Sequence, residues 1–232
     1  MSGNSAVVLT AVLCVSTFGT SAAQEASELP AVVLVGDSIR LSYAPVVTKE
    51  LQGKARVISA AANGGDSSNV LKHLNAWVIA AHPAVVHLNC GIHDTKYFRD
   101  SERFQVSPEQ YEANLRTIVE AIRSQTTAMV IFATTTPILD DRAAATRQKT
   151  DYVLTNDAVN RYNSIARRVM EPLKVPVNDL NTSLTRPSAP LQTGELIADD
   201  GVHLTQQARE LLGRQVAAEI LKHLPVKELS DR

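Results

Sequence analysis

Five short apolar segments recur along this chain, and a stretch with helical character separates each segment from the next. Most of the segments are continuous runs rich in Val and Ile, which is typical of strands covered on both faces. We predict strands at residues 31–35, 55–61, 84–90, 128–134 and 175–180. Apolar residues at helical spacing predict helices at residues 67–81, 107–124, 156–173 and 205–224.

This alternation of strands and helices predicts an α/β fold, with three α/β/α layers built around a five-stranded parallel sheet. Right-handed crossovers between parallel strands place helices on both faces of such a sheet. The chain has 232 residues, of which 44% are hydrophobic, and no internal repeat, so we expect one domain. Segments 94–108 and 139–153 follow the third and fourth strands. We expect both to be surface loops at the carboxyl edge of the sheet, where ligands bind.

The first 23 residues differ from the rest of the chain because they contain no charged side chain. Residues 6–15 are mainly apolar, and Ser21-Ala22-Ala23 offers the small residues that signal peptidase accepts. We therefore expect a signal peptide at residues 1–23 and a domain at residues 24–232 in a secreted or periplasmic protein. The leader lacks a Lys or Arg at its start, and it is too short for a stable membrane span, which needs about 20 apolar residues.

The cysteine count limits the covalent chemistry of the chain. Cleavage after residue 23 would leave only Cys90 of the two cysteines, so we expect no internal disulfide. Cys14 would also suit a lipoprotein leader, but Leu13 stands where a small residue is expected. Cys90 lies in an apolar strand and is expected to be a small buried hydrophobe.

The overall charge excludes one class of partner. The formal net charge is −1, from 23 basic and 24 acidic side chains. Nucleic-acid binding requires a basic surface that neutralises phosphates, so we expect no nucleic-acid partner.

Polar residues suited to nucleophilic catalysis lie at the two ends of the predicted domain. Ser38 follows the first strand directly, whereas Asp200 and His203 stand just before the last helix. A serine hydroxyl becomes a good nucleophile when a histidine takes its proton and a carboxylate orients that histidine. We therefore expect Ser38, Asp200 and His203 to be catalytic. The Ser38 N–H, at a helix N-terminus, is expected to donate to the oxyanion.

Four motifs in fixed order resemble the sequence blocks of the SGNH (GDSL-type) hydrolase superfamily. They are Gly36-Asp37-Ser38, residues 63–68, Gly91-Ile92-His93-Asp94 and Asp200-Gly201-Val202-His203. The resemblance covers nearly all of the chain after the leader. It implies a flavodoxin-like fold and a serine esterase that needs no metal and no organic cofactor.

The resemblance also implies an oxyanion hole formed by Ser38, Gly65 and His93. Gly64 competes with Gly65 for the second position, but the continuation after Gly65 resembles the family's usual one. His93 stands where the family normally has Asn, and the chain is similar to a branch with Gly-x-His-Asp. An amide is always a neutral donor, whereas an imidazole donates only from a protonated ring nitrogen. We expect His93 to replace the amide donor; reduced activity is the alternative.

A metal site is a further alternative, because several carboxylates and histidines could converge: His93, Asp94, Asp199, Asp200 and His203. The chain has no His-x-x-x-His helix and no Cys–His set with zinc spacing. A metal site would also leave Ser38 and Gly65 without a role. We therefore expect no metal.

These features predict a secreted serine esterase that forms an acyl-enzyme on Ser38. We expect it to hydrolyse small acyl esters, particularly O-acetyl groups on polysaccharide, since similar branches contain carbohydrate deacetylases and no long apolar lid is evident. A lysophospholipase, thioesterase or arylesterase of the same superfamily is an alternative. A catalytically weak carbohydrate-binding member is another. The sequence gives no indication of the oligomeric state.

Overall fold

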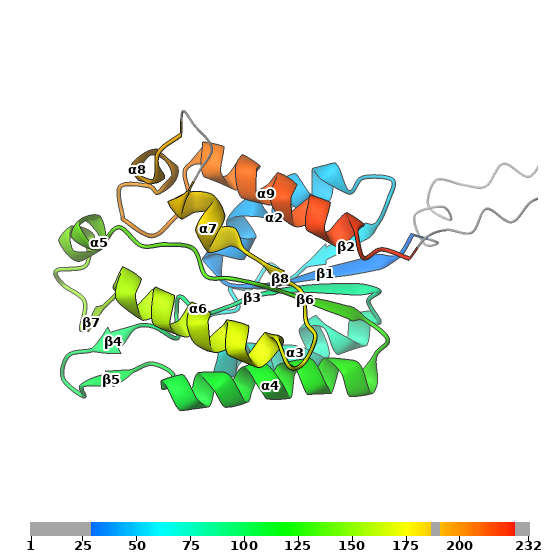
Figure 1. Cartoon of the computed structure of the whole chain (residues 1–232), viewed down its shortest axis with the longest axis horizontal. Coiled ribbons are helices and arrows are strands. Elements are labelled where there is room, and N and C mark those ends of the chain that lie inside the picture. Colours follow the sequence, from blue (N-terminus) through cyan, green and yellow to red (C-terminus); the bar gives the residue numbers. More distant parts are fainter. Residues whose placement is uncertain (1–28, 187–190, 226–232) are drawn as a thin grey trace, which may run out of the picture.

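A parallel sheet of five strands runs through the centre of the protein (Figure 1), as the apolar segments predict. The computed structural model describes residues 29–186 and 191–225, so the predicted leader lies outside the described residues. The strands occur in the order β2-β1-β3-β6-β8. Their bounds are β1 Ala31–Gly36, β2 Arg56–Ser59, β3 Val85–Asn89, β6 Met129–Ala133 and β8 Val177–Asn178.

Helices cover both faces of this sheet, which confirms the α/β/α fold class (Figure 1). One layer holds α2 (Ser38–Glu50), α7 (Leu180–Thr185), the short α8 (Thr193–Leu196) and α9 (Gln206–Leu221). The other layer holds α3 (Ser67–Trp77), α4 (Pro108–Gln125) and α6 (Asn156–Met170), with a 3₁₀ turn, η1, at Ile79–Ala81. No helix within the described residues is both long and apolar enough to cross a bilayer.

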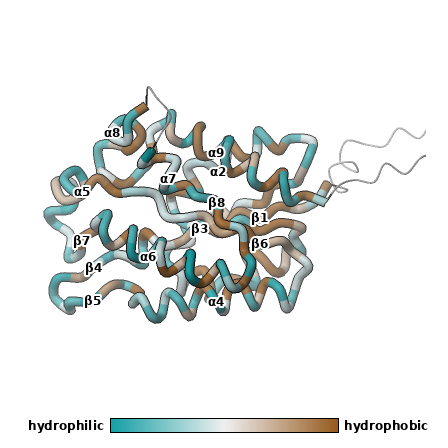
Figure 2. Tube along the Cα trace, in the orientation of Figure 1, coloured by the Kyte–Doolittle hydropathy of each residue, from teal (hydrophilic) through white to brown (hydrophobic). Residues whose placement is uncertain are grey.

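Strand β1 is buried on both faces, which explains why its sequence is continuously apolar. Val32 and Leu34 pack toward α2 and α9, whereas Val33 and Val35 pack toward α3 and α4. None of these four side chains is more than 1% exposed. Figure 2 shows the hydrophobic colour concentrated on the central strands and the hydrophilic colour on the outer helix faces.

Capping residues fix the helix starts that matter for the site. The Asp37 side chain accepts a hydrogen bond from the Ile39 N–H and so starts α2 at Ser38. Asp66 caps α3 in the same way, and Thr205 caps α9. A side-chain oxygen at this position satisfies an N–H that has no partner inside the helix.

The expectation of plain surface loops at residues 94–108 and 139–153 is wrong. The first contains β4 (Tyr97–Phe98) and β5 (Arg103–Phe104); the second contains α5 (Asp140–Thr146) and β7 (Tyr152–Val153). The three strands form a small antiparallel sheet in the order β5-β4-β7, at the end of the main sheet where α5 also lies (Figure 1). Aromatic ring contacts join these strands. The sequence does not predict them, because strands of two residues are too short to show a periodic pattern.

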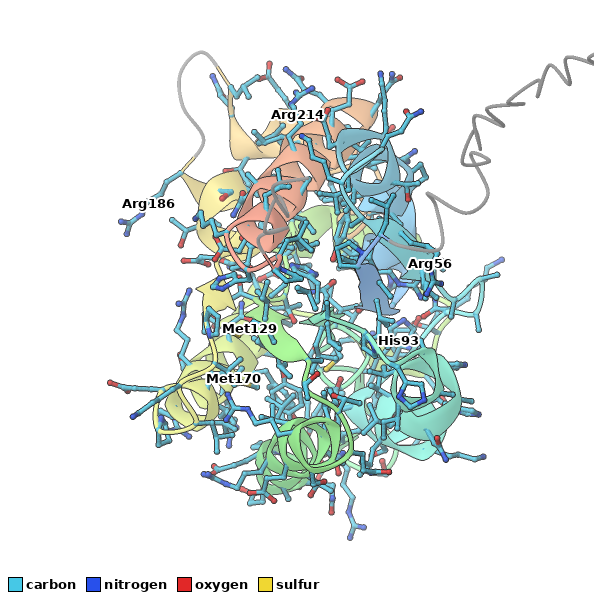
Figure 3. All side chains as sticks on the ribbon, turned by 90° about the vertical axis from the view of Figure 1, so that its right-hand side faces the viewer. Arg56, His93, Met129, Met170, Arg186 and Arg214 are labelled. Carbon is cyan, nitrogen blue, oxygen red and sulfur yellow. The ribbon has the colours of Figure 1, made fainter. Side chains whose placement is uncertain are left out.

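Gly213 lets α9 pack closely against α2. A Cβ added to Gly213 would lie 2.5 Å from Val46 Cβ and 3.3 Å from the Tyr43 carbonyl oxygen. The next residue, Arg214, is exposed on the outer side of the same layer (Figure 3). The close approach matters because α2 begins at Ser38 and α9 follows directly after the segment that holds Asp200 and His203.

We predict that Gly213→Ala lowers the free energy of unfolding by about 1–3 kcal/mol, because overpacking forces the two helices apart. The higher helix propensity of Ala offsets only up to about 1 kcal/mol. Urea denaturation measures the change. The matched control is Gly194→Ala, whose new Cβ would meet only Arg142 Nη2 at 3.8 Å. A Gly213→Ala protein as stable as the control would contradict this packing argument.

Candidate active site

Ser38 occupies the turn between the end of β1 and the start of α2, at the carboxyl edge of the main sheet. Its position at the first turn of α2 leaves its N–H without an acceptor inside the helix. Asp37, next to it, is buried and serves as the helix cap. Burial raises the pKa of Asp37 to about 6, against the opposing effect of its hydrogen bond from Ile39.

The structure brings Ser38 together with His203 and Asp200, as the sequence predicts. The Ser38 Oγ lies 3.1 Å from His203 Nε2, and His203 Nδ1 is hydrogen-bonded to Asp200 Oδ2. The other carboxylate oxygen of Asp200 accepts hydrogen bonds from the N–H groups of Val202 (3.0 Å) and His203 (2.9 Å). A single short loop therefore fixes both the carboxylate and the imidazole relative to Ser38.

Asp200 has the surroundings of an ionised carboxylate. Burial would raise its pKa, but the hydrogen bonds from the backbone of His203 and Val202 and from the His203 ring hold the pKa below its usual value. Arg147 adds a guanidinium 3.6 Å from Asp200 Oδ2 and donates to the Asp200 carbonyl oxygen at 2.7 Å. An ionised Asp200 keeps the proton of His203 on Nδ1, so Nε2 is free to accept the Ser38 proton.

The two candidate glycines of the second block differ in how their N–H groups are held. Gly64 donates to the Gly36 carbonyl oxygen at 2.8 Å, so its N–H is committed to the backbone. The Gly65 N–H donates to Asn63 Oδ1 at 2.9 Å, and a side-chain acceptor can turn away. Gly65 also has a φ of +63°, in the left-handed region that favours glycine. Of the two, Gly65 is the better candidate for an oxyanion donor.

His93 lies in the wall of the same cavity as Ser38 and His203 and is half-buried. Burial lowers the pKa of His93 to about 4; the charge of Lys96 adds to this effect, whereas Asp66 opposes it. The ring is therefore neutral near pH 7, and it can donate a hydrogen bond from only one of its nitrogens.

Asp94 holds two parts of the site together. Its buried carboxylate accepts from the Ser67 N–H at 3.0 Å and also from the Ser67 hydroxyl. Asn114 Nδ2 in turn donates to Ser67 Oγ at 2.9 Å. Burial raises the pKa of Asp94 to about 7, against these hydrogen bonds. The loop that carries His93 is thus joined to the start of α3, two residues after Gly65.

The cavity beside Ser38 has a volume of about 250 Å³, and for seven of its ten lining residues the sequence predicts no role. Its lining residues are Ser38, Asn63, Ile92, His93, Lys96, Arg147, Tyr152, Leu154, Val202 and His203. Lys96 and Tyr152 come from the two segments expected to be loops, and Arg147 follows α5. Only their position at the carboxyl edge of the sheet could have indicated a role.

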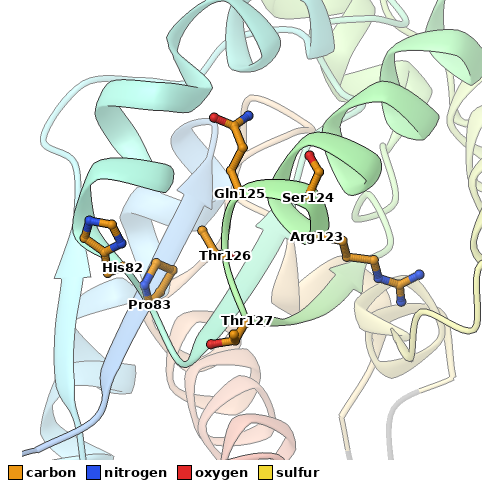
Figure 4. Close-up of a pocket in the computed structure, with 7 residues that line it drawn as sticks. All are labelled: His82, Pro83, Arg123, Ser124, Gln125, Thr126 and Thr127. Atoms are coloured by element: carbon orange, nitrogen blue, oxygen red, sulfur yellow. The ribbon is translucent and has the colours of Figure 1, made fainter.

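A larger cavity, of about 490 Å³, lies at the opposite edge of the sheet (Figure 4). It is lined by His82 and Pro83, which precede β3, and by residues 123–127, which precede β6. The Arg123 guanidinium is already bound to the Leu173 carbonyl oxygen at 2.7 Å. His82 is the only imidazole in this wall, and it has no nucleophile–carboxylate arrangement like that at Ser38.

The residues proposed for a metal alternative do not form one group. Asp94 is turned toward Ser67, whereas Asp200 is bound to His203. In the described ranges, no three or more His, Cys, Asp or Glu side chains are placed to hold a metal ion. Cys90 is buried, as expected.

Comparisons with known proteins agree with this geometry. The sequence model of the GDSL-like lipase/acylhydrolase family matches residues 19–211. No curated protein sequence is similar enough to this chain to count as a match.

Several solved structures are similar in fold. A lipase/acylhydrolase from Enterococcus faecalis is 24% identical, with a TM-score of 0.68, over 86% of this chain and 100% of that one. An acetylxylan esterase from Geobacillus stearothermophilus is 21% identical, with a TM-score of 0.67, over 82% of this chain and 94% of that one. A GDSL-like lipase from Bacteroides thetaiotaomicron is 18% identical, with a TM-score of 0.62, over 89% and 93% of the two chains.

We predict that the pH profile of p-nitrophenyl acetate hydrolysis has one rising limb and no falling limb caused by His93. The rising limb follows from the mechanism, since only a neutral His203 ring can accept the Ser38 proton. Burial gives Asp37 and Asp94 pKa values of about 6 and about 7, and they lose protons on the same rising side. His93, with a pKa of about 4, is already neutral there.

The measurement is kcat/KM against pH for the wild type and for His93→Asn. A falling alkaline limb that is present in the wild type and absent from His93→Asn would mean that His93 acts as a cation, contrary to this prediction.

Proposed function

The chain belongs to the GDSL-like lipase/acylhydrolase family and is a serine hydrolase acting on ester bonds, and we propose that Ser38, His203 and Asp200 perform its reaction. One observation carries this proposal: the Ser38 Oγ is 3.1 Å from His203 Nε2, and Asp200 holds the opposite nitrogen of that ring. A nucleophile, a base and an orienting carboxylate within hydrogen-bond reach define this mechanism.

The reaction proceeds in two steps. Ser38 Oγ attacks the ester carbonyl carbon while His203 takes the hydroxyl proton. His203 then gives this proton to the leaving alcohol as the carbon–oxygen bond breaks, and an acyl group remains on Ser38. In the second step, water loses a proton to His203, attacks the acyl-enzyme and releases the acid, and the proton returns to Ser38.

Three donors are proposed to hold the oxyanion: the N–H groups of Ser38 and Gly65 and the ring N–H of His93. Donors fixed in place before the reaction stabilise the charge that develops on the carbonyl oxygen. The Gly65 N–H becomes available when the Asn63 amide that now accepts it turns away. A neutral His93 does the work of the amide that the family usually has here, provided that its proton is on the nitrogen facing the cavity.

We propose small acyl esters, particularly O-acetyl groups on polysaccharide, as substrates of a secreted or periplasmic enzyme. The cavity of about 250 Å³ has only three aliphatic residues in its wall, Ile92, Leu154 and Val202. Such a wall favours a short acyl group over a long chain. The similar fold of an acetylxylan esterase supports the same choice, and the uncharged segment at residues 1–23 supports export.

We predict that Ser38→Ala lowers kcat on p-nitrophenyl acetate by at least about 10³, because the nucleophile is lost while the fold remains. The matched control is Ser42→Ala, one turn further along α2, where the hydroxyl only donates to the Ile39 carbonyl oxygen. Undiminished hydrolysis by Ser38→Ala would end the serine mechanism. A wild-type preference for octanoyl over acetyl esters, or no acetate release from acetylated xylan or pectin fragments, would count against the proposed substrate.

We predict that His93→Ala lowers kcat by about 10²–10³ with a smaller change in KM, because the lost hydrogen bond is strongest to the developing oxyanion. His93→Asn should recover much of this loss, since its amide also donates. Full recovery is not expected, because the imidazole reaches farther than the amide. Steady-state kinetics with p-nitrophenyl acetate measure both variants, and wild-type turnover in His93→Ala would remove His93 from the oxyanion hole.

A further inference from the structure

The cavity beside Ser38 is lined by two cations and no carboxylate. Lys96 and Arg147 are both among its ten lining residues, and none of the ten is Asp or Glu. This contrasts with the whole chain, in which acidic side chains outnumber basic ones, 24 to 23. The positive charge is therefore a local property of the cavity.

Arg147 is largely occupied by the protein itself. Its Nη1 donates to the Asp200 carbonyl oxygen at 2.7 Å and to Thr146 Oγ1 at 3.0 Å, and its Nη2 lies 3.6 Å from Asp200 Oδ2. The contacts with Asp200 give Arg147 a structural role in the loop that carries Asp200 and His203, so no ligand is needed to explain this residue. Arg147 adds positive potential to the cavity, but it is not the cation free to bind a ligand.

Lys96 has no such explanation. Within the described residues, no carboxylate oxygen lies within 4.0 Å of its ammonium, and the centroid of the Tyr152 ring is 5.0 Å from it. The side chain is half-buried, and burial lowers the pKa of Lys96; Arg147 adds to this effect, whereas Asp66 and Asp151 oppose it. Asp66 is itself engaged, since it accepts from the Asn69 N–H at 2.9 Å and from the Gln105 amide.

A half-buried ammonium without a carboxylate partner is unfavourable for the folded protein alone. The face of Tyr152 compensates in part by a cation–π contact and holds the ammonium at the cavity wall. Such an arrangement is favourable when a bound ligand supplies the missing negative charge, because opposite charges attract more strongly beside a partly buried group than in bulk water.

We propose that the substrate carries a single negative charge next to the ester, and that Lys96 binds this charge. The inference rests on the proposed function, since the same cavity holds Ser38. A carboxylate on an acetylated uronic-acid residue fits best, because the wall has few aliphatic side chains and suits a polar sugar more than a lipid. A phosphodiester offers the same charge and is distinguished by the test below.

The test uses two acetyl esters in which one group changes from a carboxylate to an uncharged carboxamide: the O-acetylated methyl glycosides of glucuronic acid and of its amide. We expect the wild type to favour the acid at least about tenfold in kcat/KM, and Lys96→Met, which keeps the apolar stem, to lose most of this preference. The matched control, Lys54→Met, removes one charge from an exposed residue between α2 and β2, at the other edge of the sheet, and should keep the preference.

Three results would overturn the proposal. The first is a wild type without preference for the acid, and the second is a Lys96→Met protein with the wild-type preference. The third is a Lys96-dependent hydrolysis of lysophosphatidylglycerol without any for the uronate; it would overturn the choice of a uronate and assign the charge that Lys96 binds to a phosphodiester. Hydrolysis of p-nitrophenyl acetate separates this failure from that of the proposed function, because an inactive wild type would contradict the esterase itself.

A measurement on the wild type alone tests the proposal even if the Lys96→Met protein does not fold. Added salt screens charge attraction, so kcat/KM for the uronate should fall with ionic strength while that for the amide should not. Equal salt dependence of the two substrates would contradict the proposal.

Discussion

The hydrogen bond between Ser38 Oγ and His203 Nε2 joins residues 165 positions apart, and much of the fold acts to hold its two ends together. One end starts α2, and the other lies in the loop before α9. These helices pack side by side because Gly213 leaves room for Val46, so the nucleophile and its base approach from adjacent elements of one layer. Because both helices rest on the same buried strands, the distance depends on the hydrophobic core as much as on the loops.

The oxyanion side of the site is held from the opposite layer by buried hydrogen bonds. The Gly64 N–H donates to Gly36 in the turn before Ser38. Asp94, next to His93, accepts from Ser67 at the start of α3. Burying Asp94 is unfavourable for its charge, as its raised pKa reflects, and the hydrogen bonds from Ser67 compensate. The Asn63 side chain has to move before the Gly65 N–H can donate to a substrate.

The main sheet and its covering helices could be predicted from the sequence, because strands such as β1 are buried on both faces and read as continuous apolar runs. Asp37 and Asp66, which cap α2 and α3, lie next to Ser38 and Gly65 in the sequence. The small sheet that brings Lys96 beside Tyr152 could not be predicted, since its two-residue strands carry no periodicity and their pairing is set by tertiary contacts. The leader at residues 1–23 stays a prediction.

A crystal structure of the protein inactivated by an alkyl fluorophosphonate would show the roles of Ser38, Gly65 and His93 together, because the tetrahedral adduct mimics the oxyanion. We expect phosphorus on Ser38 Oγ and one phosphoryl oxygen within hydrogen-bond distance of three donors: the N–H groups of Ser38 and Gly65 and the ring of His93. We also expect the Asn63 amide to have left the Gly65 N–H. An adduct on another residue, or a phosphoryl oxygen turned to solvent while Asn63 still accepts from Gly65, would contradict these roles.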